Sequence, residues 1–564
     1  MYEVIVKVEG KNITETINLQ WLHCNTRINH VPILKLRVTE GPAQTTKFPH
    51  TDEDTFKIGK KINIKAGLEK QKKTIFNGLI TEHKLGISGM VYLEVIAYGD
   101  AIKLTEGPRN QLFAAKKTDT DIIKKLFKDT EIKAGEIATS TIKHGQYFAY
   151  QQTPWRTMMA RVLSNGFLFV PQPDSNHIID PSKQKPENTH KISLLAAGLQ
   201  TFELHQDARS IIEKNDLTTW DIKKQELLKP VKGKATLNEL THTAKETLNL
   251  SELHQQEAAP LSPEEIQARA NAQQIYRTLD RFQGTLSFDA EALTEYLKGK
   301  PVALFDVIDL QDFGKNYTGK YLVSGIQHHR KENGWQIILT LGIHLNHTLF
   351  SDWLQPPPVP NLIGKIAAFK EDPEKLERIP VWLPTITNDD KKVVWARLLS
   401  PFASQSEGLH VPPSKDDEVI VGFIGGDSRY PVILGATHNP VLKPPLPYDK
   451  DNAKRGLFFK DVGDKKGEKG PLAGLHFDNK KKIMRLQGGK QAGLNLDDKE
   501  GPNLHYTKDS KKSFDKGQAL SHMIVGEKYI TQLADKKQKQ TLAKNMDIKV
   551  DGNVTVKTTM MEIK

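Results

Sequence analysis

The chain has 564 residues, of which 38% are hydrophobic, so it can bury the cores of several domains. It holds no apolar run of the roughly 20 residues that a membrane-spanning helix needs, which excludes a helical membrane protein. The single cysteine, Cys24, excludes an internal disulfide framework and a cysteine-based zinc cluster. The net charge of +12 leaves open a nucleic-acid or other anionic partner.

Residues 1–115 are predicted to form a β-domain. The first residues alternate like a strand and lack the apolar core of a signal peptide, so we expect folding in the cytoplasm. By itself this pattern fits a generic β-barrel or a sandwich equally well. The short β-branched segments that carry the prediction are Tyr2–Val8, Ile33–Val38, Lys60–Ala66, Thr74–Ile80 and Val91–Ala97.

Residues 116–190 carry the signals of an α/β segment. One helix is expected to begin near Thr118. A second is expected with Thr153 as N-cap, Pro154 as its first residue and Gly166 just after its end. Its apolar positions follow helical spacing and predict a core face, and they are Trp155, Met158, Met159, Val162 and Leu163.

Residues 191–350 return to β-like alternation. Residues 223–260 are polar and weakly periodic, which predicts a long surface excursion. Ser262–Glu265 has the pattern of a capping box with proline at the first helical position, and the helix is expected to run to about Phe282. Strands are expected after it.

Residues 351–360 are rich in proline and predict an extended linker to a further β-domain, residues 361–440. Within this domain, Val419–Ile424 and Pro431–Leu434 are joined by Gly425–Ser428, which predicts a hairpin. Because both faces of its first strand are apolar, we expect that strand to be buried on both sides.

The hairpin reads DEV-x-V-x-F-x-x-GD-x-R-x-P-V-x-x-G, and this pattern resembles the OB-fold of VgrG proteins and phage-baseplate hub-spikes. The signature positions in this chain are Asp417, Gly426, Asp427, Arg429, Pro431 and Gly435. Ile75–Ile80, Tyr150–Gly166 and Gly319–His328 resemble segments of the hub in the same family.

This resemblance implies a mainly β protein with a hub of two β-barrels, an α/β insertion, an OB-fold and a C-terminal trimeric β-helix needle. The implied domains are hub barrel 1 (1–115), the insertion (116–190), hub barrel 2 (191–350), a linker (351–360), the OB-fold (361–440), a second linker (441–454) and the needle (455–564).

The last fifth of the chain is strand-like and basic. Residues 441–564 carry 26 Lys or Arg against 16 Asp or Glu. From Met546 to Met560 the apolar residues fall mainly on even positions, which predicts a strand ribbon with one apolar face. Such a face cannot be buried by one chain alone, and three copies around an axis would bury it.

The resemblance further implies the function and the partners. The chain would form a homotrimer that caps the inner tube of a contractile injection apparatus, such as type VI secretion, and contacts baseplate proteins. Its needle would pierce the target envelope, with transient membrane contact on firing. A PAAR-type tip protein, with effectors, would bind the apolar end at Met560, Met561, Glu562 and Ile563. The protein would be cytoplasmic during assembly and injected on firing.

No enzymatic activity, cofactor, metal or catalytic residue is expected. The sequence has no Gly-rich phosphate loop, no GxSxG and no HExxH motif. Between the OB-fold and the needle only Pro440–Lys454 remain, too few residues for a catalytic domain. Two alternatives stay open, namely a nucleic-acid-binding OB protein with a basic tail and a cell-wall hydrolase spike. The spike interpretation predicts no specific nucleic-acid binding.

Overall fold

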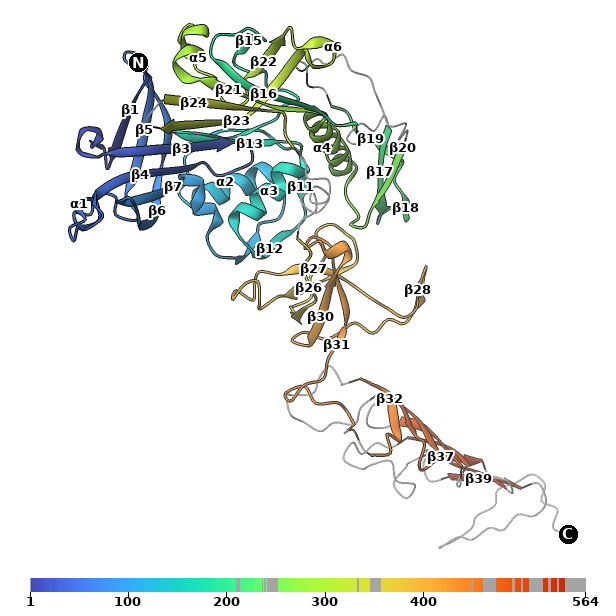
Figure 1. Ribbon diagram of the computed structural model, residues 1–564. Coiled ribbons are helices and arrows are strands. Elements are labelled where there is room, and N and C mark those ends of the chain that lie inside the picture. Colours follow the sequence, from blue (N-terminus) through green and yellow to red (C-terminus); the bar gives the residue numbers. More distant parts are fainter. Residues whose placement is uncertain are drawn as a thin grey trace, which may run out of the picture. The chain divides into compact units, whose positions relative to one another are not determined.

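The computed structural model describes residues 2–208, 214–235, 252–331, 334–344, 357–446, 450–459, 473–488, 492–498, 501–506, 521–525, 529–534 and 537–542, with the single residues 237, 240 and 448. It divides into two units, Met1–Thr437 and His438–Lys564, and each is described by itself. The fold is mainly β, as expected (Figure 1). Within the described residues no helix is long and apolar enough to cross a membrane.

The hub contains one large sheet built from two distant parts of the chain (Figure 1). The N-terminal part supplies β1 (Tyr2–Val8), β2 (Lys11–Asn12), β3 (Leu19–Arg27), β4 (Ile33–Pro42), β5 (Lys61–Leu68), β6 (Lys73–Ser88) and β7 (Met90–Gly99), with α1 (Pro49–Asp52) after β4. The later part supplies β15 (Thr189–Ser193), β16 (Leu199–Gln206), β21 (Phe282–Asp289), β22 (Val307–Gln311), β23 (Gly319–Lys331) and β24 (Gly334–Leu341), with α5 (Ala290–Tyr296) and α6 (Gly314–Tyr317).

The two groups of strands expected as separate barrels are joined edge to edge. β3 pairs antiparallel with β23, from Gly325 opposite Arg27 to Arg330 opposite Leu22. The buried side chains of both groups form one hydrophobic cluster, which extends from Val6 to Leu341. The join therefore removes two sheet edges and merges two cores.

The α/β segment has the two predicted helices. α2 (Asp119–Asp129) is capped by Thr118, and α3 (Pro154–Ser164) is capped by Thr153, with Gly166 in the left-handed region at φ +71°. Both helices pack in a second core. The strands of this segment are β8 (Arg109–Phe113), β9 (Lys117–Thr118), β10 (Ala134–Ile137), β11 (Lys143–His144), β12 (Tyr147–Gln152), β13 (Leu168–Gln172) and β14 (Ser175–Ile179).

The expected surface excursion at 223–260 is partly wrong. Its described residues form a small sheet of β17 (Lys214–Asp221), β18 (Glu226–Leu227), β19 (Val231–Lys232) and β20 (Glu252–Glu257), in which β20 runs parallel to β17. This sheet packs on α4 (Pro263–Arg281) through buried Leu217, Ala259 and Leu261. The many polar residues of this segment prevented the sequence pattern from predicting this burial.

The OB domain is a closed five-stranded barrel in the order β25-β26-β27-β31-β30. The predicted hairpin is β30 (Glu418–Phe423) paired with β31 (Pro431–Ala436). The other strands are β25 (Leu362–Ile366), β26 (Arg378–Trp382) and β27 (Val394–Leu398), and a small hairpin of β28 (Ala403–Ser404) and β29 (Glu407–Gly408) stands outside the barrel.

Burial of β30 on both sides was a wrong expectation. Val419 and Val421 point into the barrel and are fully buried, whereas Ile420 lies on the outer side and is only half-buried. A barrel strand has one inner and one outer face, and the described residues of this unit cover the outer face only in part.

The second unit is an antiparallel meander of short strands, each paired with the next. They are β32 (Lys454–Phe459), β33 (Ala473–Asp478), β34 (Ile483–Gly488), β35 (Ala492–Asp497), β36 (Gly501–Tyr506), β37 (Ser521–Val525), β38 (Tyr529–Ala534) and β39 (Lys537–Leu542). The alternating segment from Met546 to Met560 lies outside the described residues. The trimeric β-helix and the domain boundaries therefore stay predictions.

Candidate functional site: the buried junction of hub and OB domain

The turn of the β30–β31 hairpin is inserted against the hub. Gly425 and Gly426 adopt positive φ, at +61° and +71°. A Cβ on Gly425 would lie 3.1 Å from Ala258 Cβ, and one on Gly426 would lie 2.6 Å from Pro358 Cβ. Glycine is needed at both positions because the turn is left-handed and packs directly on its neighbours.

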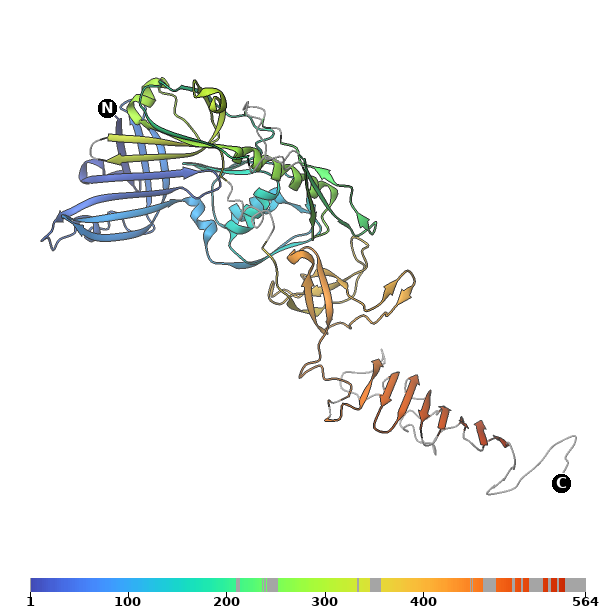
Figure 2. The same ribbon diagram turned by 45° about the vertical axis from the view of Figure 1, so that its right-hand side comes forward.

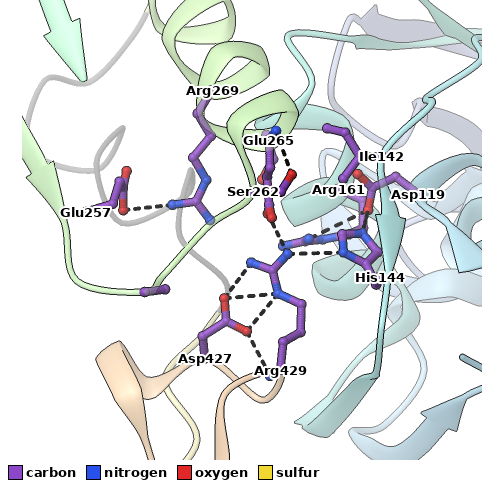
Figure 3. A network of polar contacts seen from close by, with 12 residues as sticks. Asp119, Ile142, His144, Arg161, Glu257, Ser262, Glu265, Arg269, Asp427 and Arg429 are labelled. Atoms are coloured by element: carbon purple, nitrogen blue, oxygen red, sulfur yellow. Dashed lines mark hydrogen bonds and ion pairs between the residues drawn. The ribbon is translucent and has the colours of Figure 1, made fainter. Parts of the chain in front are cut away.

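Arg429 lies at the centre of the inserted turn and is almost completely buried. Its guanidinium donates to Asp427 through Nε, at 2.9 and 3.1 Å, and through Nη2, at 2.6 Å. Nη1 donates to the Glu265 carboxylate in the first turn of α4 and to Nδ1 of His144, at 3.1 Å (Figure 3). One side chain of the OB domain therefore joins two separate elements of the hub.

The network continues into the α/β segment of the hub. Because His144 Nδ1 accepts from Arg429, its Nε2 carries the proton and donates to Asp119 Oδ1 at 2.7 Å. Asp119 also accepts from Asn165 Nδ2 at 2.8 Å. It forms an ion pair with Arg161 Nη1 at 3.6 Å (Figure 3). Asp119, His144 and Arg161 are all buried.

Backbone contacts and apolar packing reinforce the junction. Gln146 Nε2 donates to the carbonyls of Trp395 and Arg429, and its Oε1 accepts from Trp395 N at 2.8 Å. Phe148, in hub strand β12, belongs to the hydrophobic core of the OB barrel and packs edge-on against Phe423 at 5.6 Å. The hub thus supplies part of the OB core.

The charges in the network hold one another ionised. Burial alone would raise the pKa of Asp119 and Asp427, but His144 and Arg161 lower the first, and Arg429 lowers the second, well below the usual range. For Arg429, burial acts to lower the pKa, but Asp427 and Glu265 raise it well above its usual value. Each charge therefore depends on the presence of its partners.

A cavity of about 490 Å³ borders this network. Polar and aromatic side chains from the hub and from the OB domain line it, among them Lys143, Trp220, Glu374, Arg378, Trp395 and Arg397. No group of three or more His, Cys, Asp or Glu among the described residues could hold a metal ion. The chemistry of this site is charge pairing across a domain junction.

The remaining signature residues shape the hairpin. Asp417 Oδ2 accepts from Ser414 N at 2.7 Å and fixes the entry to β30. Pro431 is buried at the start of β31, opposite Phe423. Gly435 lies opposite Ile420, beside a shift in register. The four residues predicted to bind a tip protein, Met560, Met561, Glu562 and Ile563, lie outside the described residues.

Comparison with known families identifies both parts of the first unit. Residues 1–332, more than half of the chain, match the family model of the Alg8 N-terminal domain. Residues 362–438 match that of the type VI secretion system/phage-baseplate injector OB domain. The chain belongs to the Alg8 N-terminal domain family, and its OB barrel is of the type VI secretion/phage-baseplate injector type.

Solved structures share the fold of this chain at low sequence identity. A chain of the lidded Francisella PdpA–VgrG complex is 11% identical, with a TM-score of 0.56, over 90% of this chain and 80% of that one. The E. coli c3393 protein, a component of the type VI secretion system with structural similarity to the T4 bacteriophage tail proteins gp27 and gp5, is 12% identical, with a TM-score of 0.50, over 77% and 99%. No curated protein sequence matches the chain.

The hairpin half of the junction is predicted from the sequence, and the hub half is not. Glu265 was interpreted as the second half of a capping box. Ser262 Oγ does accept from Glu265 N, but the Glu265 carboxylate turns to Arg429 instead. Asp119 is the first residue of the helix that the sequence predicts to begin near Thr118. The sequence shows an acid in the first turn of each helix, but it does not show that Glu265 pairs with Arg429, 164 residues away, or that Asp119 pairs with His144, 25 residues away.

Replacing Arg429 with methionine is expected to destabilise the first unit by about 3–5 kcal/mol, because Asp427 and Glu265 would remain buried without their cation. The free energy of unfolding in urea measures the effect. The matched control is Lys392→Met, which removes an exposed ion pair with Asp389 and should change stability by less than about 1 kcal/mol. Equal losses in the two variants would contradict a central role for Arg429.

Stability should fall with acid through Asp119. Its pKa is depressed in the folded state, so between about pH 4 and the folded pKa the unfolded chain binds more protons, and stability is lost as pH decreases. Each such carboxylate contributes up to about 1.4 kcal/mol per pH unit in that range. Asp119→Asn keeps an acceptor for His144 but cannot titrate, so its melting temperature should fall less between pH 5 and pH 3 than that of the native protein. Parallel pH profiles would refute the assignment.

Proposed function

We propose that the chain acts as a homotrimer, in which the hub caps the inner tube of a contractile injection apparatus and the C-terminal unit is the needle. The proposed division follows the predicted domains, with the hub in residues 1–350, the OB collar in 361–440 and the needle in 455–564. The function is mechanical. The hub receives the force of sheath contraction, and the needle applies it to a small area of the target envelope.

The observation that carries the proposal is an apolar row across the meander of the second unit. The backbone register places Leu457 opposite Leu475, Leu475 opposite Leu486, Leu486 opposite Leu494, and Leu494 opposite Leu504. Leu457, Leu486 and Leu504 are 46%, 54% and 51% exposed. Five successive strands thus present leucine on one face with little to cover it.

A trimer accounts for this face better than a monomer does. The next residues along the strands form a polar row on the other side, in which Arg485 Nε donates to Asn495 Oδ1 at 3.0 Å. A single sheet with one apolar face needs a partner to be stable. Three copies around an axis bury the three leucine rows together, leave the polar rows outside, and remove the open sheet edges.

The buried junction holds the hub and the OB barrel together, so that force can pass from one to the other. Arg429, Gln146 and Phe148 connect the two by charge, by backbone hydrogen bonds and by a shared core. Separating them would expose the shared apolar core to water and break the hydrogen bonds that Gln146 and Arg429 make across the junction. Force that reaches the hub is therefore transmitted through the OB domain into the chain that follows it.

The proposed partners are the inner tube, baseplate proteins, a PAAR-type tip protein and effectors, in an apparatus assembled in the cytoplasm and injected on firing. In Francisella, VgrG forms a complex with PdpA, so a hub-spike of this fold can hold a second protein. A mechanical role without catalysis fits the junction, where acids are paired with buried cations. No specific observation favours nucleic-acid binding or cell-wall hydrolysis.

The native mass of the full chain should be near three times 63.5 kDa by light scattering. Leu486→Glu places a charge in the leucine row and should lower the fraction of trimer and its thermal stability. Gln487→Glu adds the same charge to the opposite face of the same strand and should leave the trimer intact. A monomeric native protein, or equal effects of the two variants, would overturn the trimeric needle.

Removing the residues after Asp551 should abolish capture of a PAAR-type tip protein while the mass stays trimeric, because Met560, Met561, Glu562 and Ile563 would be lost. Binding is measured by co-purification with a tagged tip protein. A second variant, Met561→Asp with Ile563→Asp, keeps the length and should weaken capture in the same direction. Unchanged capture by both variants would rule out this docking end.

A further inference from the structure

The OB domain carries an arm that stands away from the barrel. Residues 399–413 leave the barrel after β27, form the β28–β29 hairpin and return to β30. Hydrogen bonds from Ser400 Oγ to the carbonyls of Phe402 and Leu409, and from Leu409 N to Phe402 O at 3.0 Å, fix its base. Figures 1 and 2 show the hairpin extending away from the barrel, and all twelve residues from 401 to 412 are exposed.

The arm is apolar and nearly uncharged. Leu399 and Phe402 are 57% and 55% exposed, and Leu409 and Val411 are 45% and 39% exposed. The arm contains one carboxylate, Glu407, and no Lys or Arg, in a chain that is 26% charged. Large apolar side chains held in water on a hairpin do not stabilise a single chain. Exposed apolar surfaces of this kind mark contacts with other molecules.

The outer wall of the same barrel carries a matching apolar stripe. Ile363 lies opposite Ile420 on adjacent strands, and Leu434 lies on the next strand, where a Cβ on Gly422 would be 3.1 Å from Leu434 Cδ1. Ile363 and Leu434 are 55% and 44% exposed. Ile363 and Ile420 alternate with buried residues along their strands and so lie on the outward face of the barrel wall, and Leu434 follows the buried Ile433 at the register shift of β31.

We propose that the arm of one copy packs on the stripe of the neighbouring copy, with Phe402 of the arm against Ile363 of the neighbour. This inference rests on the homotrimer of the proposed function. The occupant is a second copy because arm and stripe belong to the same domain and the arm leads away from its own barrel. A contact between two different surfaces, repeated around a three-fold axis, closes into a ring in which every arm and every stripe is used.

Cysteine cross-linking of the full chain tests the contact. The native protein has one cysteine, Cys24, which is buried. In Phe402→Cys/Ile363→Cys, mild oxidation should give dimers and closed trimers on a non-reducing gel, and a reductant should remove them. A disulfide forms only where the two Cα atoms approach within about 7 Å, so the product reports direct packing.

Three controls define specificity. Phe402→Cys alone and Ile363→Cys alone should remain uncross-linked. Phe402→Cys/Leu195→Cys places the second thiol at a hub residue that is 93% exposed and should also remain uncross-linked. Phe402→Ser should lower the melting temperature of the trimer, whereas Leu195→Ser should not.

The outcomes separate this inference from the proposed function. A trimeric mass without a cross-link in Phe402→Cys/Ile363→Cys overturns the arm contact and leaves the trimer standing. A cross-link in Phe402→Cys alone overturns it too, because the arms would then meet each other. Equal cross-linking to Leu195→Cys likewise overturns it. A monomeric mass for the native chain overturns the trimer and the arm contact together.

Discussion

The junction of this protein depends on one desolvated cation. A guanidinium taken out of water loses several kcal/mol of solvation, which only charged partners in good geometry can return. Arg429 finds two carboxylates, Asp427 in its own turn and Glu265 at the start of α4, and a further acceptor, Nδ1 of His144 in the α/β segment. The hairpin, the helix and the strand must therefore be in place together, which couples the folding of the OB barrel to that of the hub.

The hub segments around Arg429 are organised to receive it. Ser262 caps α4 and so fixes the helix turn that carries Glu265. Thr118 caps α2, whose first residue, Asp119, orients His144 through its Nε2. Two helix starts thus present acids at their N-termini, where the helix dipole also favours negative charge. The same first turns of α2 and α4 therefore take part both in helix capping and in the ionic contacts of the junction.

The outer surfaces follow the opposite pattern. Inside the hub, apolar residues from both ends of the sheet are buried in one core. The OB wall, the arm and the meander instead expose Ile363, Phe402 and Leu486. Ile363 and Leu486 lie on strand faces that alternate with buried or polar ones, and Phe402 lies on an arm whose residues 401–412 are all exposed. The proposed trimer would cover these apolar side chains with copies of the same chain.

The sequence by itself determined the local elements and the family. Thr153, Pro154 and Gly166 mark the two ends of a helix because capping and backbone freedom are properties of single residues, and the hairpin motif is read within nineteen positions, from 417 to 435. Only the tertiary structure decided what the motif is for. Glu265 and His144 meet Arg429 across 164 and 285 residues, β3 pairs with β23 from the far end of the hub sequence, and Ile420 on the outer face of β30 is only half-buried. Ion pairs and strand pairing join residues that are close in space but far apart in the sequence. The periodicity of a segment does not show which distant segment supplies its ion-pair partner or its neighbouring strand.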